Sequence, residues 1–186
     1  ENGNIQELET LLQVNWNYRD NISSGVIVDR TGVDDAEYYV YDSTGQRVRK
    51  VKETLTSLVN NTVEIEEKIY TGNVETKKIR VVQGGTSTTI LNRSSLHVMD
   101  DTRRIATVHN WTTDTLEREI NAQGELNTNK IRYQYGNHID SASLELDSSG
   151  SIISYEEYFP YGDTSLIAGT SQKEVKIKEY RYTGKE

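Results

Sequence analysis

Turn signals at short intervals constrain this chain more than any other feature of its sequence. Glycine-containing turns separate short runs of alternating and β-branched residues, which is the pattern of strands joined by tight connections. The clearest case is a pair of alternating runs, residues 62–70 and 74–82, separated by Thr71-Gly72-Asn73. We therefore predict a β-hairpin over residues 62–82, followed by a second turn at residues 83–85.

The same pattern predicts strands in most of the remaining sequence. The expected strands cover residues 90–98, 103–111, 130–135, 142–146, 152–159 and 175–182, and residues 121–129 form a polar loop. Residues 5–13 fit either a helical turn or, preferably, a strand that continues to Trp16 and Tyr18. Because the connections are short, we expect an all-β fold of antiparallel hairpins in a curved sheet, with no internal domain boundary over residues 1–186.

Tyrosine dominates the aromatic residues, with 12 Tyr against two Trp and one Phe. A tyrosine ring packs while its hydroxyl stays hydrated, so this composition favours sheets with one wet face. Tyrosines two residues apart, which share one face of a strand, recur at 39 and 41, 133 and 135, and 180 and 182. Asp-x-x-Gly at residues 42–45 and 147–150 is a type I turn signature. The repeated unit is a strand that ends in a tight turn, although both patterns are also common in unrelated β proteins.

The residue inventory excludes several classes of function. A formal net charge of -8 disfavours non-specific nucleic-acid binding. The absence of cysteine excludes disulfides and thiolate zinc sites. No apolar stretch approaches the roughly 18 residues of a membrane span. Residues 1–4 do not resemble a signal peptide, and without an initiating Met we expect a cleaved or excised piece of a longer protein.

Few residues qualify as catalytic or metal-binding candidates. His97 and His109 fall in adjacent predicted strands, where a two-histidine metal site is conceivable, but we interpret both as polar strand residues. His138 is interpreted as a turn or packing residue. Glu156 and Glu157 are neighbours, and neighbouring residues on a strand face opposite sides, so they do not form an acid pair. We therefore expect a protein that is not an enzyme, with no catalytic residue, cofactor or metal ion.

A longer and more specific motif runs from Tyr133 to Gly162. It begins Tyr-Gln-Tyr-Gly-Asn-His-Ile-Asp-Ser, continues with Asp-Ser-Ser-Gly and closes with Tyr-Phe-Pro-Tyr-Gly. This run, and residues 131–186 as a whole, resembles the Rhs-associated core of YD/Rhs-repeat proteins, similar to the Rhs-containing components of bacterial Tc insecticidal toxin complexes. Residues 181–186, Arg-Tyr-Thr-Gly-Lys-Glu, resemble the start of the next family element. The expected structural motif comprises Tyr39, Tyr41, Asp42, Gly45, Tyr133, Tyr135, His138, Asp147, Gly150, Tyr155, Tyr158, Pro160, Gly162, Tyr182 and Gly184.

The resemblance implies a β-sheet strip that spirals into a hollow shell and encapsulates a C-terminal toxin effector for secretion or delivery. Its implied partners are the remainder of its own shell, the enclosed effector and other toxin-complex subunits, with no nucleic acid and no membrane span. The implied location is secreted or on the bacterial cell surface, within a larger toxin complex. The family's autoproteolytic residues are expected downstream of Glu186.

Two other functions stay open from the sequence. The first is a cell-surface adhesion or carbohydrate-binding β-module, in which Trp111 and Tyr135 stack on sugar rings. The second is a hydrolase that uses Asp and Glu side chains, although no group of them converges in the sequence. The sequence does not identify the effector or the host, or which face of the sheet lines a cavity.

Overall fold

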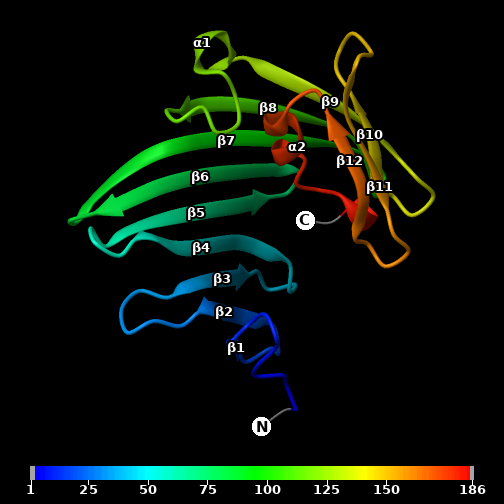
Figure 1. Cartoon of the computed structure of the whole chain (residues 1–186). Helices are drawn as coiled ribbons and strands as arrows, with labels where there is room; N and C mark the ends of the chain where they lie inside the picture. Colours follow the sequence, from blue (N-terminus) through cyan, green and yellow to red (C-terminus); the bar gives the residue numbers. More distant parts are fainter. Residues whose placement is uncertain (1–2, 185–186) are drawn as a thin grey trace. The chain divides into compact units, whose positions relative to one another are not determined.

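The chain is all-β in the computed structural model, which describes residues 3–184 apart from the side chains of residues 122 and 123 (Figure 1). The strands are β1 (Gln13–Trp16), β2 (Ile22–Val28), β3 (Asp35–Tyr41), β4 (Arg47–Ser57), β5 (Thr62–Thr71), β6 (Val74–Gln83), β7 (Thr86–Asp100), β8 (Arg103–Asp114), β9 (Asn129–Gly136), β10 (Ala142–Leu146), β11 (Ile152–Tyr158) and β12 (Thr164–Gly169). The short helices are α1 (Ala122–Glu125), α2 (Gln172–Ile177) and η1 (Tyr182–Gly184).

The strands of the described residues form one sheet in which spatial order equals chain order, from β1 to β12. The pairings of β1 to β6 and of β8 to β12 are antiparallel throughout. Because this order is linear, β1 and β12 are edges and the sheet is not closed. The predicted fold class is therefore confirmed.

The chain divides into two compact units, unit 1 up to Asn92 and unit 2 from Arg93 onward. No sequence signal marks this division, because it falls inside the continuous strand β7. Among residues 3–184, no helix combines the length and the apolar character that a membrane span requires.

The hairpin predicted over residues 62–82 is present in unit 1 as β5 and β6. Its register ends at Thr71 paired with Val74, and Gly72 takes a left-handed φ of 58° in the turn. The neighbouring strands place opposite charges across from one another, since Lys52 on β4 pairs with both Glu37 and Glu66. Such cross-strand pairs stabilise a sheet by about 0.2–1 kcal/mol each. These pairings explain why strands as charged as β4 form, although it was not predicted from the sequence.

Five hairpins close with the same five-residue loop. The loops cover residues 17–21, 42–46, 137–141, 147–151 and 159–163. In each loop the first N–H donates to the fifth carbonyl, and the fourth residue has a positive φ between 59° and 101°. In four of them an Asn or Asp side chain at the first position accepts bonds of 2.8–3.1 Å from the third and fifth backbone N–H groups. This is a type I turn followed by a left-handed residue.

The strand predicted over residues 175–182 is wrong. Residues 172–177 form α2, and residues 182–184 form η1. Ser171 caps α2, because its side chain accepts a 3.2 Å hydrogen bond from the Glu174 N–H. Helical spacing then places Glu174, Ile177 and Lys178 on one side, where each has a partner in the sheet of unit 2.

Two further segments differ from the prediction. Residues 5–13 are not helical, because Leu8 and Leu11 exchange backbone hydrogen bonds of 2.9 and 3.1 Å across a tight turn, and the favoured strand begins only at Gln13. The polar loop over residues 121–129 contains α1 and ends where β9 begins. The strands β2 and β12 were not predicted, since their short Ser- and Gly-containing sequences carry little alternation.

Among the described residues, apolar packing in each unit forms a small cluster. In unit 1, Ile79, Ile90 and Leu91 pack together, with Val81 beside them. In unit 2, the second cluster consists of Trp111 from β8, Ile120 from the segment after β8, and Ile177 from α2, with Leu126 beside it. Much of the buried side-chain volume is instead polar or charged, including Arg93, Arg132, Glu145 and Glu156.

We expect Gly150→Ala to lower the free energy of unfolding by about 1 kcal/mol, because a Cβ disfavours the left-handed conformation that Gly150 adopts at φ 81°. Gly32→Ala is the matched control. An added Cβ meets nothing within 4 Å at either glycine, but Gly32 lies outside the left-handed region. Urea unfolding of both variants measures the difference, and equal losses would contradict the role assigned to the loop.

Candidate functional site

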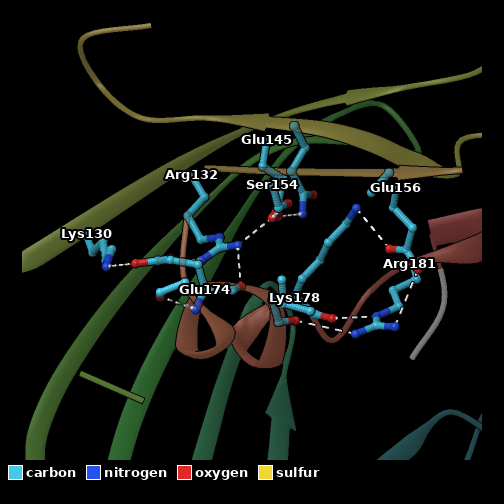
Figure 2. A network of polar contacts seen from close by, with 12 residues as sticks. Lys130, Arg132, Glu145, Ser154, Glu156, Glu174, Lys178 and Arg181 are labelled. Atoms are coloured by element: carbon cyan, nitrogen blue, oxygen red, sulfur yellow. Dashed lines mark hydrogen bonds and ion pairs between the residues drawn. The ribbon is translucent and has the colours of Figure 1, made fainter. Parts of the chain in front are cut away.

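The most distinctive arrangement of side chains lies in unit 2, beneath residues 171–184, which we call the strap. The strap follows β12 and turns back over one face of the sheet, where α2 packs beside β11 and β12 (Figure 1). Strap side chains meet charged residues that project from β7, β9 and β11. Figure 2 shows the part of this network around Arg132 and Glu156. The strap therefore covers a face that carries many charged side chains.

Arg132 on β9 joins the sheet to α2. Its side chain is 1% exposed, and its guanidinium lies 2.5 Å from Glu145 on β10 and 2.5 Å from Glu174 in the strap. Arg132 also donates a 2.9 Å bond to the Glu174 carbonyl oxygen. Lys130, two residues earlier on β9, pairs with the same Glu174 carboxylate. One strap carboxylate thus holds two sheet cations.

Glu145 is fixed by a full set of donors. Ser154 on β11 donates to one carboxylate oxygen at 2.6 Å, and Gln134 donates to the other at 2.9 Å. Burial alone raises the pKa of Glu145, but attraction to Arg132 and the hydrogen bonds to Arg132, Gln134 and Ser154 hold that pKa below its ordinary value. The carboxylate is therefore ionised and does not serve as a proton donor at neutral pH.

Glu156 on β11 is the second anchor of the strap. It is fully buried, and Lys178 and Arg181 from the strap lie 3.0 and 3.4 Å from its carboxylate oxygens. Thr164 and Tyr158 donate further bonds of 2.6 and 2.9 Å. Burial lowers the pKa of Lys178, although the hydrogen bond and charge of Glu156 oppose that shift. Burial and the bond to Glu156 raise the pKa of Tyr158.

The two neighbouring glutamates of β11 face opposite sides, as the sequence predicted. Glu156 is buried under the strap, whereas Glu157 is exposed and accepts a 2.9 Å bond from the Tyr155 hydroxyl. The pair therefore lacks the shared cleft that two catalytic carboxylates require.

Arg93 on β7 makes the third set of contacts. Its guanidinium lies 3.0 Å from Glu119 and 2.6 Å from Glu179 in the strap. Glu119 also accepts a 2.8 Å bond from the indole N–H of Trp111. Ile177 and Trp111 belong to one buried apolar cluster, so apolar packing and charge pairing hold the strap at the same place.

His97 and His109 lie under the strap on β7 and β8, but each has its own hydroxyl partner. His109 Nδ1 is 2.8 Å from Ser95 Oγ, and His97 Nδ1 is 3.5 Å from Thr107 Oγ1. Burial, together with the charges of Arg93 and Arg132, keeps the pKa of His109 well below its ordinary value. Among the residues described, no three His, Asp or Glu side chains are placed to hold a metal ion.

The end of the strap brings together four residues that the sequence analysis had placed in the structural motif. The Tyr182 hydroxyl donates a 2.8 Å bond to the Pro160 carbonyl, and its ring lies 5.8 Å from the Tyr158 ring. A Cβ added at Gly162 would meet the Tyr182 ring at 2.7 Å, so this loop needs glycine for close approach as well as for its φ of 101°. Lys185 and Glu186, the last two residues of the Arg-Tyr-Thr-Gly-Lys-Glu run, lie outside the described residues.

The remaining motif residues lie elsewhere. In unit 1, Tyr39 and Tyr41 are half-buried on β3, where the Tyr39 hydroxyl bonds to Glu37, and Asp42 and Gly45 belong to the 42–46 loop. In unit 2, Tyr133, Tyr135 and Tyr155 are exposed, unlike the buried Arg132, Glu145 and Ser154 that alternate with them along the strands. His138 is exposed in the 137–141 loop, Asp147 and Gly150 belong to the 147–151 loop, and Gly184 ends η1.

The charged residues that hold the strap were not predicted from the sequence. One signal was available in β9, where Lys130, Arg132 and Gln134 alternate with Ile131 and Tyr133. This alternation shows a polar face but not what covers it, because the covering residues lie more than 40 positions away in sequence. The site's chemistry is charge pairing, since its carboxylates are occupied by buried cations and a main-chain segment covers them.

Comparisons with known proteins find similarity to two toxin subunits. No protein-family model matches the sequence. The chain is 33% identical over 174 residues to toxin subunit YenC1 of Yersinia entomophaga and 31% identical over 183 residues to toxin subunit YenC2 of the same organism. These alignments cover 93% and 98% of the chain but only 16% and 17% of the two relatives. The chain therefore corresponds to a small part of each curated relative.

Solved structures agree with this match. The fold resembles part of the TcdB2-TccC3 crystal structure, with a TM-score of 0.80, 31% identity and 96% of the chain covered. The TcdB2-TccC3-Cdc42 crystal structure gives a TM-score of 0.77 with 34% identity over 94% of the chain. The Photorhabdus luminescens Tc holotoxin pore, carrying a TccC3 mutation, gives 0.80 with 32% identity over 97%. In each case the chain covers 8% of the larger chain.

We expect Arg132→Ala to lower the free energy of unfolding by about 3–5 kcal/mol, because it leaves Glu145 buried without its cation. Arg103→Ala is the control, since Arg103 pairs with Asp140 at 2.7 Å but is 54% exposed, and an exposed pair contributes about 1 kcal/mol or less. Denaturant titration measures both variants. A loss for Arg132→Ala as small as for Arg103→Ala would show that the buried pairs do not hold unit 2.

Gly162→Ala should loosen the end of the strap, because the new Cβ overlaps the Tyr182 ring. Gly150→Ala is again the matched control, with a similar φ of 81° but no atom within 4 Å of the added Cβ. Limited proteolysis after residue 178 measures release of the strap. We expect faster cleavage for Gly162→Ala only, and equal rates in the two variants would contradict the contact.

Proposed function

This chain is homologous to the Yersinia toxin subunits YenC1 and YenC2 and is an Rhs-like protein of the Tc-toxin type, and on that premise we propose that it forms part of the wall of a β-shell around a toxin polypeptide. The observation that carries the proposal is the linear order of antiparallel strands, which leaves the described sheet open at β1 and β12. Open edges present unpaired backbone groups to further strands. A sheet that further strands can extend at both edges is suited to forming part of a shell wall.

The limited apolar packing supports the same role. In the part of the chain that the structure describes, the buried apolar cluster of each unit is small, whereas large apolar side chains such as Tyr38, Val40 and Ile69 stay more than two-fifths exposed on unit 1. A self-contained domain usually buries such residues in one core. Strands stabilised mainly by their neighbours are instead typical of repeat architectures, in which each unit depends on the next.

In this proposal the chain acts by enclosure and carries out no chemistry. The wall keeps a passenger polypeptide away from proteases and from its targets until delivery. The tyrosine pairs and the five-residue loops serve as structural motifs that set strand packing and reversal. The similar structures contain TcdB2 together with TccC3, which supports partners from a secreted toxin complex as well as the rest of the shell and its effector.

The structure argues against the alternative of a sugar-binding platform built on Trp111. The Trp111 side chain is 1% exposed in a cluster with Ile120 and Ile177, and its N–H is bonded to Glu119. It therefore has no free ring face for a sugar. Tyr135 is exposed beside Tyr133 on the same strand, but it cannot form a stacking surface together with the buried Trp111.

Single cysteines on opposite faces of unit 1 test the proposed enclosure, because the chain has no cysteine of its own. Val40 and Lys52 are both exposed, and the register of β3 with β4 places them on opposite faces. In the isolated chain, Val40→Cys and Lys52→Cys should both react with a bulky maleimide. In the longer polypeptide that contains the shell, we expect one of the two to be protected by about tenfold or more. Equal labelling of both in that polypeptide would contradict enclosure.

A further inference from the structure

One titratable group is sealed under the strap without an ionic partner. His109 on β8 is 5% exposed, its Nδ1 lies 2.8 Å from the buried Ser95 hydroxyl, and the Trp111 ring lies beside it with 5.4 Å between centroids. Ile177 of the strap belongs to the same buried apolar cluster as that tryptophan. The hydrogen-bond partner of the imidazole is a neutral hydroxyl, so a proton added to the ring gains no carboxylate bond. Its charge state is therefore tied to closure of the strap.

The surroundings of His109 are rich in cations. The register of β8 with β9 places Lys130 directly opposite His109 and places Arg132 opposite Thr107, one diagonal step away on the same face. Arg93 lies two residues before Ser95 on β7 and so shares its face. The charged and titratable groups around the imidazole are Arg93 and His97 from β7, Glu119 from the loop after β8, Lys130 and Arg132 from β9, Glu145 from β10, and Glu174 and Glu179 from the strap.

The strap supplies part of the charge that balances these cations. Glu174 pairs with Lys130 and Arg132, and Glu179 pairs with Arg93. When the strap is closed, these carboxylates are already occupied, so a further positive charge at His109 is unmatched. When the strap opens, water reaches the imidazole and solvates its charged form.

We propose that His109 is an acid-sensitive latch, and that its protonation below about pH 6.5 releases the strap from the sheet of unit 2. The latch is a property of unit 2 and is independent of whether the sheet encloses a passenger. It would give this part of the chain a closed state at neutral pH and an open state, with Arg93, Arg132 and Glu156 exposed to solvent, in an acidic medium.

The direction of the pH dependence follows from the two states. The pKa of His109 lies well below its ordinary value in the closed state. Burial is the largest cause, and the positive charges of Arg93 and Arg132 add to it. In the open state the hydrated ring returns to about 6.5. Below that pH the open state binds a proton that the closed state does not, so the opening equilibrium constant rises about tenfold per pH unit until the closed-state pKa is reached. Glu145 has a lowered pKa, so its loss of charge belongs to a separate and more acidic window.

Hydrogen exchange of the 186-residue chain between pH 7.5 and 4.5, corrected for intrinsic rates, tests the latch. The reporters are strap N–H groups bonded within the closed structure, such as those of Val175 and Lys178. We expect their protection to fall about tenfold per pH unit below pH 6.5 in the native chain. His109→Gln should remove this slope, and His138→Gln, in an exposed loop, should retain it.

A flat profile in the native chain, or a slope that persists in His109→Gln, would overturn the proposal. If His109→Gln does not fold, a titration of the native chain with ¹³C-labelled histidine followed by NMR decides the question. The latch requires His109 to titrate well below pH 6.5, together with loss of strap protection. A His109 midpoint at or above pH 6.5 overturns it as well.

Discussion

The matching of buried charges is the constraint on which unit 2 depends. An ion taken out of water costs several kcal/mol unless a partner of opposite sign meets it in good geometry. The strap carries both signs, with Glu174 and Glu179 facing Arg132 and Arg93, and Lys178 facing Glu156. A shift of the strap by one residue would place like charges together. The pairing therefore fixes one position for the segment, which apolar contact at Ile177 alone would not do.

Opposite charges are also matched in unit 1, by side chains that are less buried. There Lys52 lies between Glu37 and Glu66 across neighbouring strands. Stability there comes largely from ladders of hydrogen bonds and cross-strand pairs, since the buried apolar cluster is small. This explains the polar composition of the chain, with only 34% hydrophobic residues. A sheet built in this way tolerates water on both faces, as the proposed wall requires.

Local features were predictable from the sequence, and long-range ones were not. The β5–β6 hairpin and the Asp-x-x-Gly loops follow from alternation and turn chemistry within a few residues. The loops that start at Asn17 and Asn137 share the same geometry but carry Asp in place of Gly at the left-handed position. The Asp-x-x-Gly signature therefore did not identify them. The strap was predicted as a strand because residues 175–182 alternate. Its helix forms because of partners such as Arg132 and Trp111, which no local pattern identifies.

The uniform five-residue loops have a consequence for how such a chain can evolve. Each loop has the same length, so it sets in the same way which face the side chains of the next strand point to, whatever the sequence of the loop. Since side chains alternate with a period of two, a change of phase would turn an entire strand over. A two-strand segment with its loop can therefore be duplicated or deleted while every other strand keeps its facing. Lineages can lengthen or shorten the strip in steps of one hairpin, and the duplicated copies are then free to diverge.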